Sequence, residues 1–278
     1  MEVALREYIQ EASVVLKEFL GDQKPVCLLI LGSGLNAYAE SLEEPSFLDF
    51  NRVPHMHVSS AEGHKGRFVL GKVPGTQNSV LVMQGRIHGY EGCDAWQVAF
   101  PVWVCNAVGI TILFTTNAVG AINPSFKVGS FCVMTDQINM TGRNPISGME
   151  PHYMAQRFVP MKDAFDSNLR NHLLDCAQKL DIELFSGIYL GVLGPTYETP
   201  AEVRMFATWG ADIVAMSVCE EVIAARHVGM KVLGMSLISN MACGIKGGDP
   251  TSQEVNEVGV QSEKKFERLM NAFLKTLD

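Results

Sequence analysis

Short apolar runs recur along the chain and alternate with segments of helical pattern. The runs lie at residues 26–31, 79–83, 111–115, 131–135, 188–193, 212–216 and 231–238. Continuous runs of this length are typical of strands buried on both faces of a sheet. Apolar residues fall at helical spacing in residues 3–20, 94–108, 167–180, 199–209 and 218–229. This alternation predicts an α/β fold: a single domain over residues 1–278, with a central mixed, largely parallel sheet flanked by helices.

Two segments are less sharply defined by this pattern. An apolar stripe that ends at Leu277 predicts a last helix, which starts either at Asp249-Pro250 or at a capping box from Thr251 to Glu254. Residues 136–166 are polar, contain several glycines and prolines, and show little periodicity. A loop this long in a compact domain is usually functional or lies at an interface, and we expect one of these roles here.

Composition and charge exclude several classes of protein. The 278 residues are 47% hydrophobic, the net charge is −8, and Lys and Arg form no long run, which argues against a nucleic-acid partner. No stretch is long and apolar enough to cross a membrane. The seven cysteines form no C-x-x-C pair, and no secretory segment opens the chain. We therefore expect a soluble, cytoplasmic protein.

The stretch CLLILGSGLN, residues 27–36, joins a buried strand to a loop of almost bare backbone. Gly32, Gly34 and Ala37 match G-x-G-x-x-A, which is found in dinucleotide sites, but such a site also needs an acid after the second buried strand. Asp49, the nearest candidate, follows no clean buried strand. Ser33, between the glycines, suits a single phosphate instead. A plain tight turn into a helix is the third interpretation.

A second glycine-flanked stretch, MQGRIHGYEG, carries Arg86, His88 and Tyr90 at every other position. In an extended chain this spacing places all three side chains on one side. Arginine offers a planar fork to a phosphate, and histidine can donate to the same anion. The pattern favours an anion site over a solvated surface group.

Further polar residues follow the ends of predicted strands, where open α/β sheets place their ligands. They are the TTNA sequence within residues 114–130, the pair Tyr197 and Glu198, Ser217 and Asn240. Each also has a structural interpretation, as a turn residue, a helix cap or a charge at a helix N-terminus. No spacing typical of a metal site or of a Ser-His-Asp triad is present. His55 and His57 lie two apart without further ligands, and we expect no metal.

Together these segments resemble the purine nucleoside phosphorylase family, in its trimeric class, from about residue 25 to residue 275. The most specific are GSGL (32–35), EGHKGRFVLG (62–71), QGRIHGYEG (84–92), TTNAVGAINPSFKVG (115–129), GPTYETPAE (194–202) and VLGMSLISN (232–240). The resemblance implies reversible phosphorolysis of purine nucleosides such as inosine and guanosine. The products are the free base and ribose 1-phosphate. It implies no cofactor, inorganic phosphate as co-substrate, and a homotrimer.

The resemblance also assigns roles to residues. Phosphate would be held by Ser33, His64, Arg86, His88, Ser217 and the backbone N–H of Ala118. The ribose would contact Tyr90, Met216 and, from a neighbouring subunit, Phe158. The base would contact Tyr197, Glu198 and Asn240. Asn240, Glu198 and His88 would be the catalytic groups, with Asn240 on O6 and N7 of the purine and Glu198 on its N1–H.

The chain departs from the family pattern at three positions. Tyr197 replaces the commoner Phe, Glu220 stands where Pro is common, and Ser252 stands where many members carry the His that binds the ribose 5′-hydroxyl. If Ser252 does not fill that role, His55 and His57 are the next candidates.

Other activities remain open from the sequence alone. Methylthioadenosine phosphorylase shares the fold, but it prefers a 6-amino purine and an apolar 5′ pocket, whereas Asn240 favours a 6-oxopurine. A dinucleotide-dependent oxidoreductase and a catalytically silent nucleoside-binding protein are weaker alternatives. The sequence does not separate inosine from guanosine or xanthosine.

Overall fold

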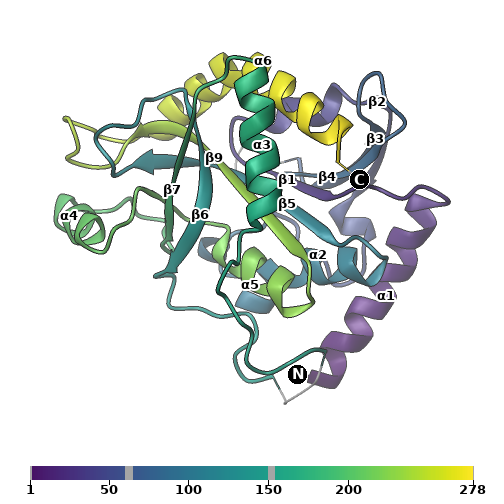
Figure 1. Ribbon diagram of the computed structural model, residues 1–278. Coiled ribbons are helices and arrows are strands. Elements are labelled where there is room, and N and C mark those ends of the chain that lie inside the picture. The colour runs from purple at the N-terminus through teal and green to yellow at the C-terminus, as the bar shows by residue number, and fades with distance from the viewer. Residues whose placement is uncertain (1, 60–64, 150–153, 278) are drawn as a thin grey trace.

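A computed structural model describes residues 2–59, 65–149 and 154–277, and its centre is one mixed sheet (Figure 1). In this part of the chain the sheet has nine strands in the order β2-β3-β4-β1-β5-β8-β7-β6-β9. Their bounds are β1 Leu28–Leu31, β2 Glu43–Asp49, β3 Arg67–Lys72, β4 Ser79–Gln84, β5 Ile112–Ala121, β6 Phe131–Asn139, β7 Leu184–Gly191, β8 Ile213–Ala215 and β9 Lys231–Met241.

The sheet closes on itself at one end. The long strand β5 pairs in parallel with β1 and β9, and its last residues pair antiparallel with β8. Strand β6 joins β9 to β7, and β7 pairs with β8, so that β5, β9, β6, β7 and β8 form a ring. On the open side β4 continues the sheet from β1, and β3 and β2 follow it antiparallel. The predicted mixed sheet is confirmed.

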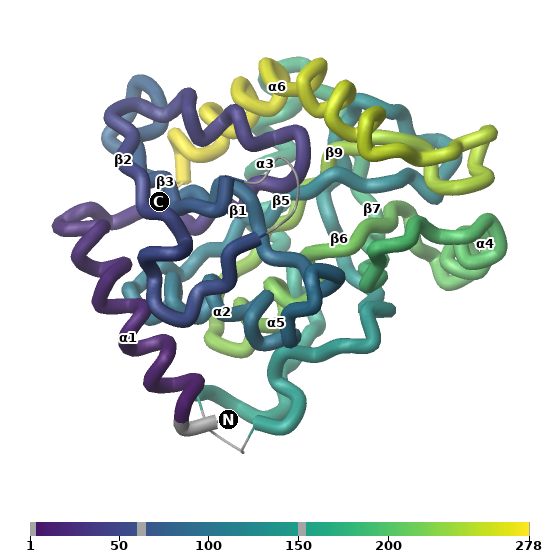
Figure 2. The backbone as a smooth tube through the Cα atoms, turned by 180° about the vertical axis from the view of Figure 1, so that it is seen from behind, coloured from purple at the N-terminus to yellow at the C-terminus, as the bar shows by residue number. Residues whose placement is uncertain are grey.

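Helices cover both faces of the sheet. They are α1 Glu2–Leu20, α2 Ala95–Ala107, α3 Ser167–Lys179, α4 Pro200–Thr208, α5 Cys219–His227 and α6 Ser252–Lys275, with short 3₁₀ turns η1 Asn36–Glu40, η2 Phe50–Arg52 and η3 Gly89–Glu91. Helices α1, α2 and α5 pack together on one face, and α3 packs with α6 on the other. Helix α4 stands at the edge of the molecule, far from α1, in both views (Figures 1 and 2).

Strand β1 shows why its apolar run is continuous. Leu28 and Ile30 belong to the core under α1, α2 and α5, whereas Leu29 and Leu31 belong to the core under α3 and α6. Because successive side chains of a strand point to opposite faces, a strand covered on both sides has no polar positions. All four residues are buried.

Several element boundaries differ from those predicted. Strands β2 and β3 were not predicted. Strand β2 is an edge strand with a single buried residue and so shows no apolar run, and the apolar run of β3 spans only residues 68–70. Strand β6 extends to Asn139, which shortens the irregular segment that was expected over 136–166. The TTNA sequence lies inside β5 rather than after it, since β9 pairs with β5 to its last residue.

The last helix begins at the second of its two predicted starts. Thr251 is the N-cap of α6, and its side chain accepts a hydrogen bond from the backbone N–H of Glu254. At the other end of α6, Nδ2 of Asn78 donates to the carbonyl oxygens of Leu274 (2.9 Å) and Leu277 (3.1 Å). The C-terminus is thereby held beside the β3–β4 turn, as Figure 2 shows from behind. No helix among the described residues could span a membrane.

Candidate active site

A cavity of about 340 Å³ opens where β1, β5 and β9 end, between α6 and the segment before α4. Most of the residues predicted from the sequence line it together: Ser33, Arg86, His88, Tyr90, Ala118, Tyr197, Glu198, Met216, Ser217 and Asn240. Two predicted residues are not in this set. Phe158 is 85% exposed on the segment before α3, and His64 lies outside the described residues.

The glycines of the GSGL loop allow close contact between backbones. A Cβ on Gly32 would lie 2.5 Å from Cα of Asn117 in β5, and a Cβ on Gly34 would lie 2.7 Å from Cα of Gly259 in α6. Gly34 also has φ +76°, which favours glycine. The loop therefore brings β1, β5 and α6 together at one end of the cavity. Asp49 ends the antiparallel edge strand β2, so the arrangement expected of a dinucleotide site is not present.

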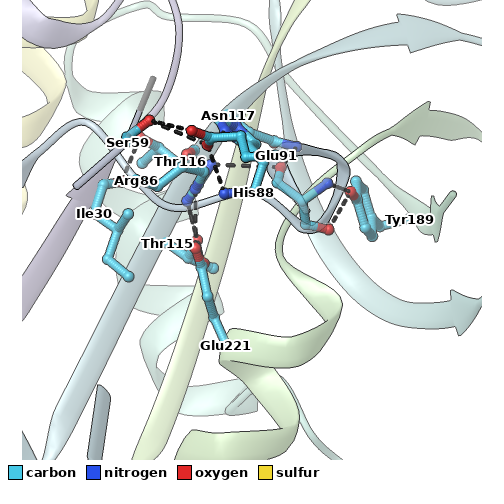
Figure 3. A network of polar contacts seen from close by, with 11 residues as sticks. Ile30, Ser59, Arg86, His88, Glu91, Thr115, Thr116, Asn117, Tyr189 and Glu221 are labelled. Carbon is cyan, nitrogen blue, oxygen red and sulfur yellow. Dashed lines mark hydrogen bonds and ion pairs between the residues drawn. The ribbon is translucent and has the colours of Figure 1, made fainter. Parts of the chain in front are cut away.

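Arg86 is the most buried charged group of the cavity (Figure 3). Its Nε donates to Oε1 of Glu221 at 2.9 Å and its Nη2 to Oε2 at 3.2 Å, a bidentate ion pair. Nη2 also donates to Oγ1 of Thr115 at 2.8 Å, and Nη1 donates to the carbonyl oxygen of Thr116 at 2.6 Å. The guanidinium is thus fixed by strand β5 and helix α5, with Nη1 also 3.5 Å from Oγ of Ser217. The guanidinium is thus already oriented, and its Nη1 side, beside Ser217, is the part that suits an oxyanion.

His88 is oriented by an acid three residues further on. Oε1 of Glu91 accepts from the backbone N–H of His88 at 2.9 Å and lies 3.0 Å from its Nδ1. Oγ of Ser59 donates to the same carboxylate at 3.1 Å, as Figure 3 shows. Burial lowers the pKa of His88, Glu91 opposes the shift, and Arg86 adds to it. Nδ1 of His88 faces Glu91, and Tyr90 stacks on the ring with centroids 4.6 Å apart.

Ser217 sits at a strained turn between β8 and α5. Val218 has φ +74° and ψ −48°, and the N–H of Cys219 donates to the carbonyl of Ser217 at 2.9 Å, which closes a γ-turn. A β-branched residue rarely takes a positive φ, so the surrounding contacts must impose it. Oη of Tyr189 donates to the Ser217 carbonyl at 2.6 Å, and Nδ2 of Asn117 donates to Oγ of Ser217 at 3.2 Å. These contacts hold the hydroxyl in the cavity beside Arg86.

Asn240 reaches the cavity through an irregularity in β9. The register of β5 and β9 shifts after Val119, where Ser239 is the extra residue of a bulge. A bulge changes the direction of the side chains that follow it. Nδ2 of Asn240 donates to Oγ of Ser239 at 3.0 Å, and the hydroxyl of Ser239 donates to the carbonyl of Val119 at 3.2 Å. A Cβ on Gly120 would come within 3.0 Å of Oδ1 of Asn240, so glycine leaves room for the amide.

Glu198 and Tyr197 come from the segment before α4 and complete this end of the cavity. Glu198 is buried, and burial raises the pKa of its carboxyl, with its own backbone N–H opposing the shift and Glu202 adding to it. Tyr197 is 43% exposed and offers an aromatic face at the mouth. A buried acceptor beside an amide and an aromatic ring suits a flat heterocycle that carries N–H groups.

The structure also brings in residues that the sequence did not identify. Glu221 binds Arg86, and Glu91 binds His88, yet neither was predicted. The His-x-x-Glu spacing is that of a capping box and could have indicated Glu91. Nothing in the sequence links Glu221 to Arg86, which lies 135 positions earlier.

The 5′-hydroxyl candidates separate clearly. Ser252 lines the cavity, and Asn256, one helical turn later on α6, lines it too. His55 lies elsewhere: its Nε2 is 2.6 Å from Oε2 of Glu11, and its ring stacks on Tyr8. His57 does not line the cavity.

Comparisons with known proteins agree with this geometry. The profile of the Phosphorylase superfamily matches residues 27–275. Purine nucleoside phosphorylase 1 of Bacillus subtilis is 42% identical over 270 residues, which cover 97% of this chain and 98% of that protein. Purine nucleoside phosphorylase of Bos taurus is 36% identical, covering 92% and 90%.

A solved structure gives the same result for the fold. The Schistosoma mansoni purine nucleoside phosphorylase in complex with adenosine superposes with a TM-score of 0.89 at 30% identity, covering 98% of both chains. A schistosoma purine nucleoside phosphorylase in complex with hypoxanthine superposes equally well. The chain therefore belongs to the phosphorylase superfamily, and within it to the purine nucleoside phosphorylase family.

Proposed function

We propose that the cavity catalyses the reversible phosphorolysis of purine nucleosides, with 6-oxopurines such as those of inosine and guanosine preferred. The observation that carries this proposal is the pairing of two unlike ends in one cavity. One end gathers Arg86, His88 and Ser217, which suit an oxyanion, and the other gathers Glu198 and Asn240, which suit a purine. Relatives named as purine nucleoside phosphorylases support the assignment.

The residue types explain the reaction without a nucleophilic side chain. Phosphate, held by Arg86, His88, Ser217, Ser33 and the N–H of Ala118, attacks C1′ of the ribose. The C1′–N9 bond breaks, its electron pair moves onto the purine, and the purine takes up a proton. Asn240 stabilises that charge by bonding O6 and N7, while Glu198 holds N1–H. These contacts strengthen as the charge develops, which is what lowers the barrier. Phosphate is the co-substrate, and the proposal requires no cofactor.

The 5′ end of the cavity favours a nucleoside with a 5′-hydroxyl over methylthioadenosine. Ser252 and Asn256, both polar, line the wall that would face the 5′ position. An apolar methylthio group gains little against such side chains. Asn240 bears an amide that can donate to O6, whereas a 6-amino group would present a second donor to it.

We further propose a homotrimer in which Phe158 enters the ribose pocket of a neighbouring subunit. An exposed aromatic side chain on a segment of irregular backbone is typical of an interface. Met140 and Leu193 are also exposed apolar residues, and the backbone N–H of Met140 donates to the Gly191 carbonyl, two residues before Leu193. Light scattering should give the mass of a trimer, and Phe158→Ala should raise KM for the nucleoside. An active monomer would contradict this proposal.

The state of the cysteines supports our proposal that the protein is cytoplasmic. All seven are free thiols, and six of them are buried. Burial raises the pKa of the Cys27 thiol to about 12, so it is inert and belongs to the core. Free buried thiols are typical of proteins of a reducing compartment.

A substrate comparison tests the assignment. Initial rates should be measured for inosine, guanosine, adenosine and methylthioadenosine at saturating phosphate. We expect kcat/KM to be highest for the two 6-oxopurine nucleosides. Preference for methylthioadenosine would instead favour the sister activity.

A further inference from the structure

One guanidinium outside the cavity holds the turn that carries Tyr90. Arg143, which follows β6, donates from Nη1 to the carbonyl of Gly89 at 2.9 Å and from Nη2 to the carbonyl of Cys93 at 2.6 Å. These two carbonyls lie on either side of Tyr90 in the sequence. A single planar side chain therefore fixes both ends of the turn.

The backbone of Arg143 is itself fixed. Its carbonyl accepts from Nδ2 of Asn139 at 2.9 Å, and its N–H donates to Oγ1 of Thr141 at 3.1 Å. Oδ1 of Asn139 accepts in turn from the N–H and the hydroxyl of Thr141. The direction in which Arg143 leaves the chain is thus set by side chains at the end of β6.

Gly89 leaves space for this guanidinium. A Cβ on Gly89 would lie 2.5 Å from Nη1 of Arg143 and 2.9 Å from Cδ1 of Leu193. Gly89 has no positive φ that would require glycine. Glycine at this position therefore leaves room for both Arg143 and Leu193.

Glu220 supplies the matching charge. Its Oε1 lies 3.6 Å from Nε of Arg143, and its side chain is only 4% exposed. Burial raises the pKa of this carboxyl, the Arg143 charge opposes that shift, and Glu221 adds to it. Glu220 is adjacent to Glu221, which binds Arg86. The first turn of α5 thus holds Arg86 directly and the Gly89–Cys93 turn through Arg143.

We propose that Arg143 and Glu220 are positioning residues that keep the Tyr90 turn in the shape that binds ribose. This inference rests on the proposed function, and it gives a role to an acidic residue where the family commonly shows proline. Arg143 acts on the turn through two carbonyls, and Glu220 acts through Arg143. The base end is formed by Asn240 and Glu198, which come from other segments: β9 and the segment before α4.

The test separates the two ends by choice of ligand. In Arg143→Met we expect kcat/KM for inosine to fall about 10- to 100-fold, since a shift of about 1 Å in a positioning group has effects of this size. Affinity for hypoxanthine alone, measured by calorimetry, should change by less than about twofold, because Arg143 lies outside the base end and sites without shared partners couple weakly. Arg143→Lys keeps the charge but cannot bridge two carbonyls, so it should restore activity only in part.

Three further variants test whether Glu220 acts through Arg143, and Arg143 through the Gly89–Cys93 turn. Gly89→Ala should reproduce the loss seen in Arg143→Met, because the added methyl group displaces the guanidinium. Glu220→Gln should lower inosine activity in the wild-type background but not in Arg143→Met. The double variant Arg143→Met/Glu220→Gln has a further use, because it does not leave the buried Glu220 carboxylate without Arg143. Arg268→Met removes another arginine that caps a carbonyl, that of Leu180 (3.3 Å), far from the cavity, and should have no effect.

The outcomes distinguish the inference from the function. An equal loss of hypoxanthine and inosine binding, or full activity in Arg143→Met, would overturn the inference while leaving the function intact. If Arg143→Met and Glu220→Gln lower the activity additively, Glu220 does not act through Arg143. A wild-type protein that lacks phosphorolysis altogether would overturn both.

Discussion

The two ends of the cavity are built in different ways. At the phosphate end, buried side chains hold one another: Glu221 and Thr115 hold Arg86, and Glu91 holds His88. At the base end the backbone does this work, through the bulge at Ser239 that redirects Asn240. Tyr197 at that end is half-exposed, beside the buried Glu198 and Asn240, whereas Arg86 is 1% exposed.

This difference indicates what each end requires. A buried guanidinium is costly to desolvate, so it needs a carboxylate and hydrogen bonds before any ligand arrives. A neutral purine needs only correctly placed hydrogen-bond donors and acceptors, and the bound purine itself covers the side chains around it. Substitutions at the phosphate end should therefore affect folding as well as catalysis, and those at the base end should affect mainly catalysis.

The largest effect is expected at the Arg86–Glu221 pair. Glu221→Gln leaves a buried cation without its counter-charge and should lower the free energy of unfolding by about 3–5 kcal/mol. Chemical denaturation measures this. The double variant Arg86→Met/Glu221→Leu should be more stable than Glu221→Gln, although inactive. A Glu221→Gln protein as stable as wild type would show that the phosphate end is not built around this pair.

The next effect concerns the base end. Asn240→Asp replaces an amide that donates to O6 with an acceptor. A polar mismatch of this kind costs roughly 1–3 kcal/mol, or about 5- to 150-fold in kcat/KM for inosine. Activity toward adenosine should rise relative to inosine. Unchanged discrimination would remove Asn240 from the base site.

A smaller effect is expected at the 5′ end of the ribose. Ser252 is shorter than the histidine that the family resemblance implies at the ribose 5′-hydroxyl, so we expect that contact to be weaker by about 0.5–1.5 kcal/mol, the range of a neutral hydrogen bond. Ser252→His should increase the preference for inosine over 5′-deoxyinosine, measured as a ratio of kcat/KM values. If wild type already shows a strong preference, Asn256→Ala should abolish it.

The smallest effect lies in the pH dependence of stability, which differs in sign between the two ends. The pKa of His88 is lowered by burial, so stability is lost as the pH falls through the ordinary histidine value of about 6.5. The pKa of Glu198 is raised by burial, so stability is lost as the pH rises above the ordinary glutamate value of about 4.3.

Matched variants resolve the two contributions. Denaturation at several pH values should show that the stability of His88→Gln falls less steeply toward acid pH than that of wild type. The charged neighbours Glu91, Arg86 and Glu221 are the same in both proteins, so the difference reports on His88. Glu198→Gln should instead reduce the loss of stability that occurs as the pH rises above about 4.3. Identical slopes in wild type and both variants would contradict the assigned shifts.

The sequence predicted the cavity residues more fully than their supports. Ser33 and Arg86 follow apolar strands and stand in glycine-rich motifs, and Asn240 closes the apolar run of β9, so local patterns identify them. Glu221 was not predicted because its partner Arg86 is distant in the chain, and no local sequence pattern indicates such a contact. Strand β2 was missed because an edge strand needs no apolar run. The bulge in β9 depends on pairing with β5, which period alone does not reveal.

The central claim is that the end of the cavity around Arg86 binds phosphate as a reactant. The most direct measurement follows purine release from inosine with and without inorganic phosphate and identifies the sugar product. The account predicts release of hypoxanthine only when phosphate is present, with ribose 1-phosphate formed in equal amount. Release at the same rate without phosphate, with free ribose as the product, would contradict it.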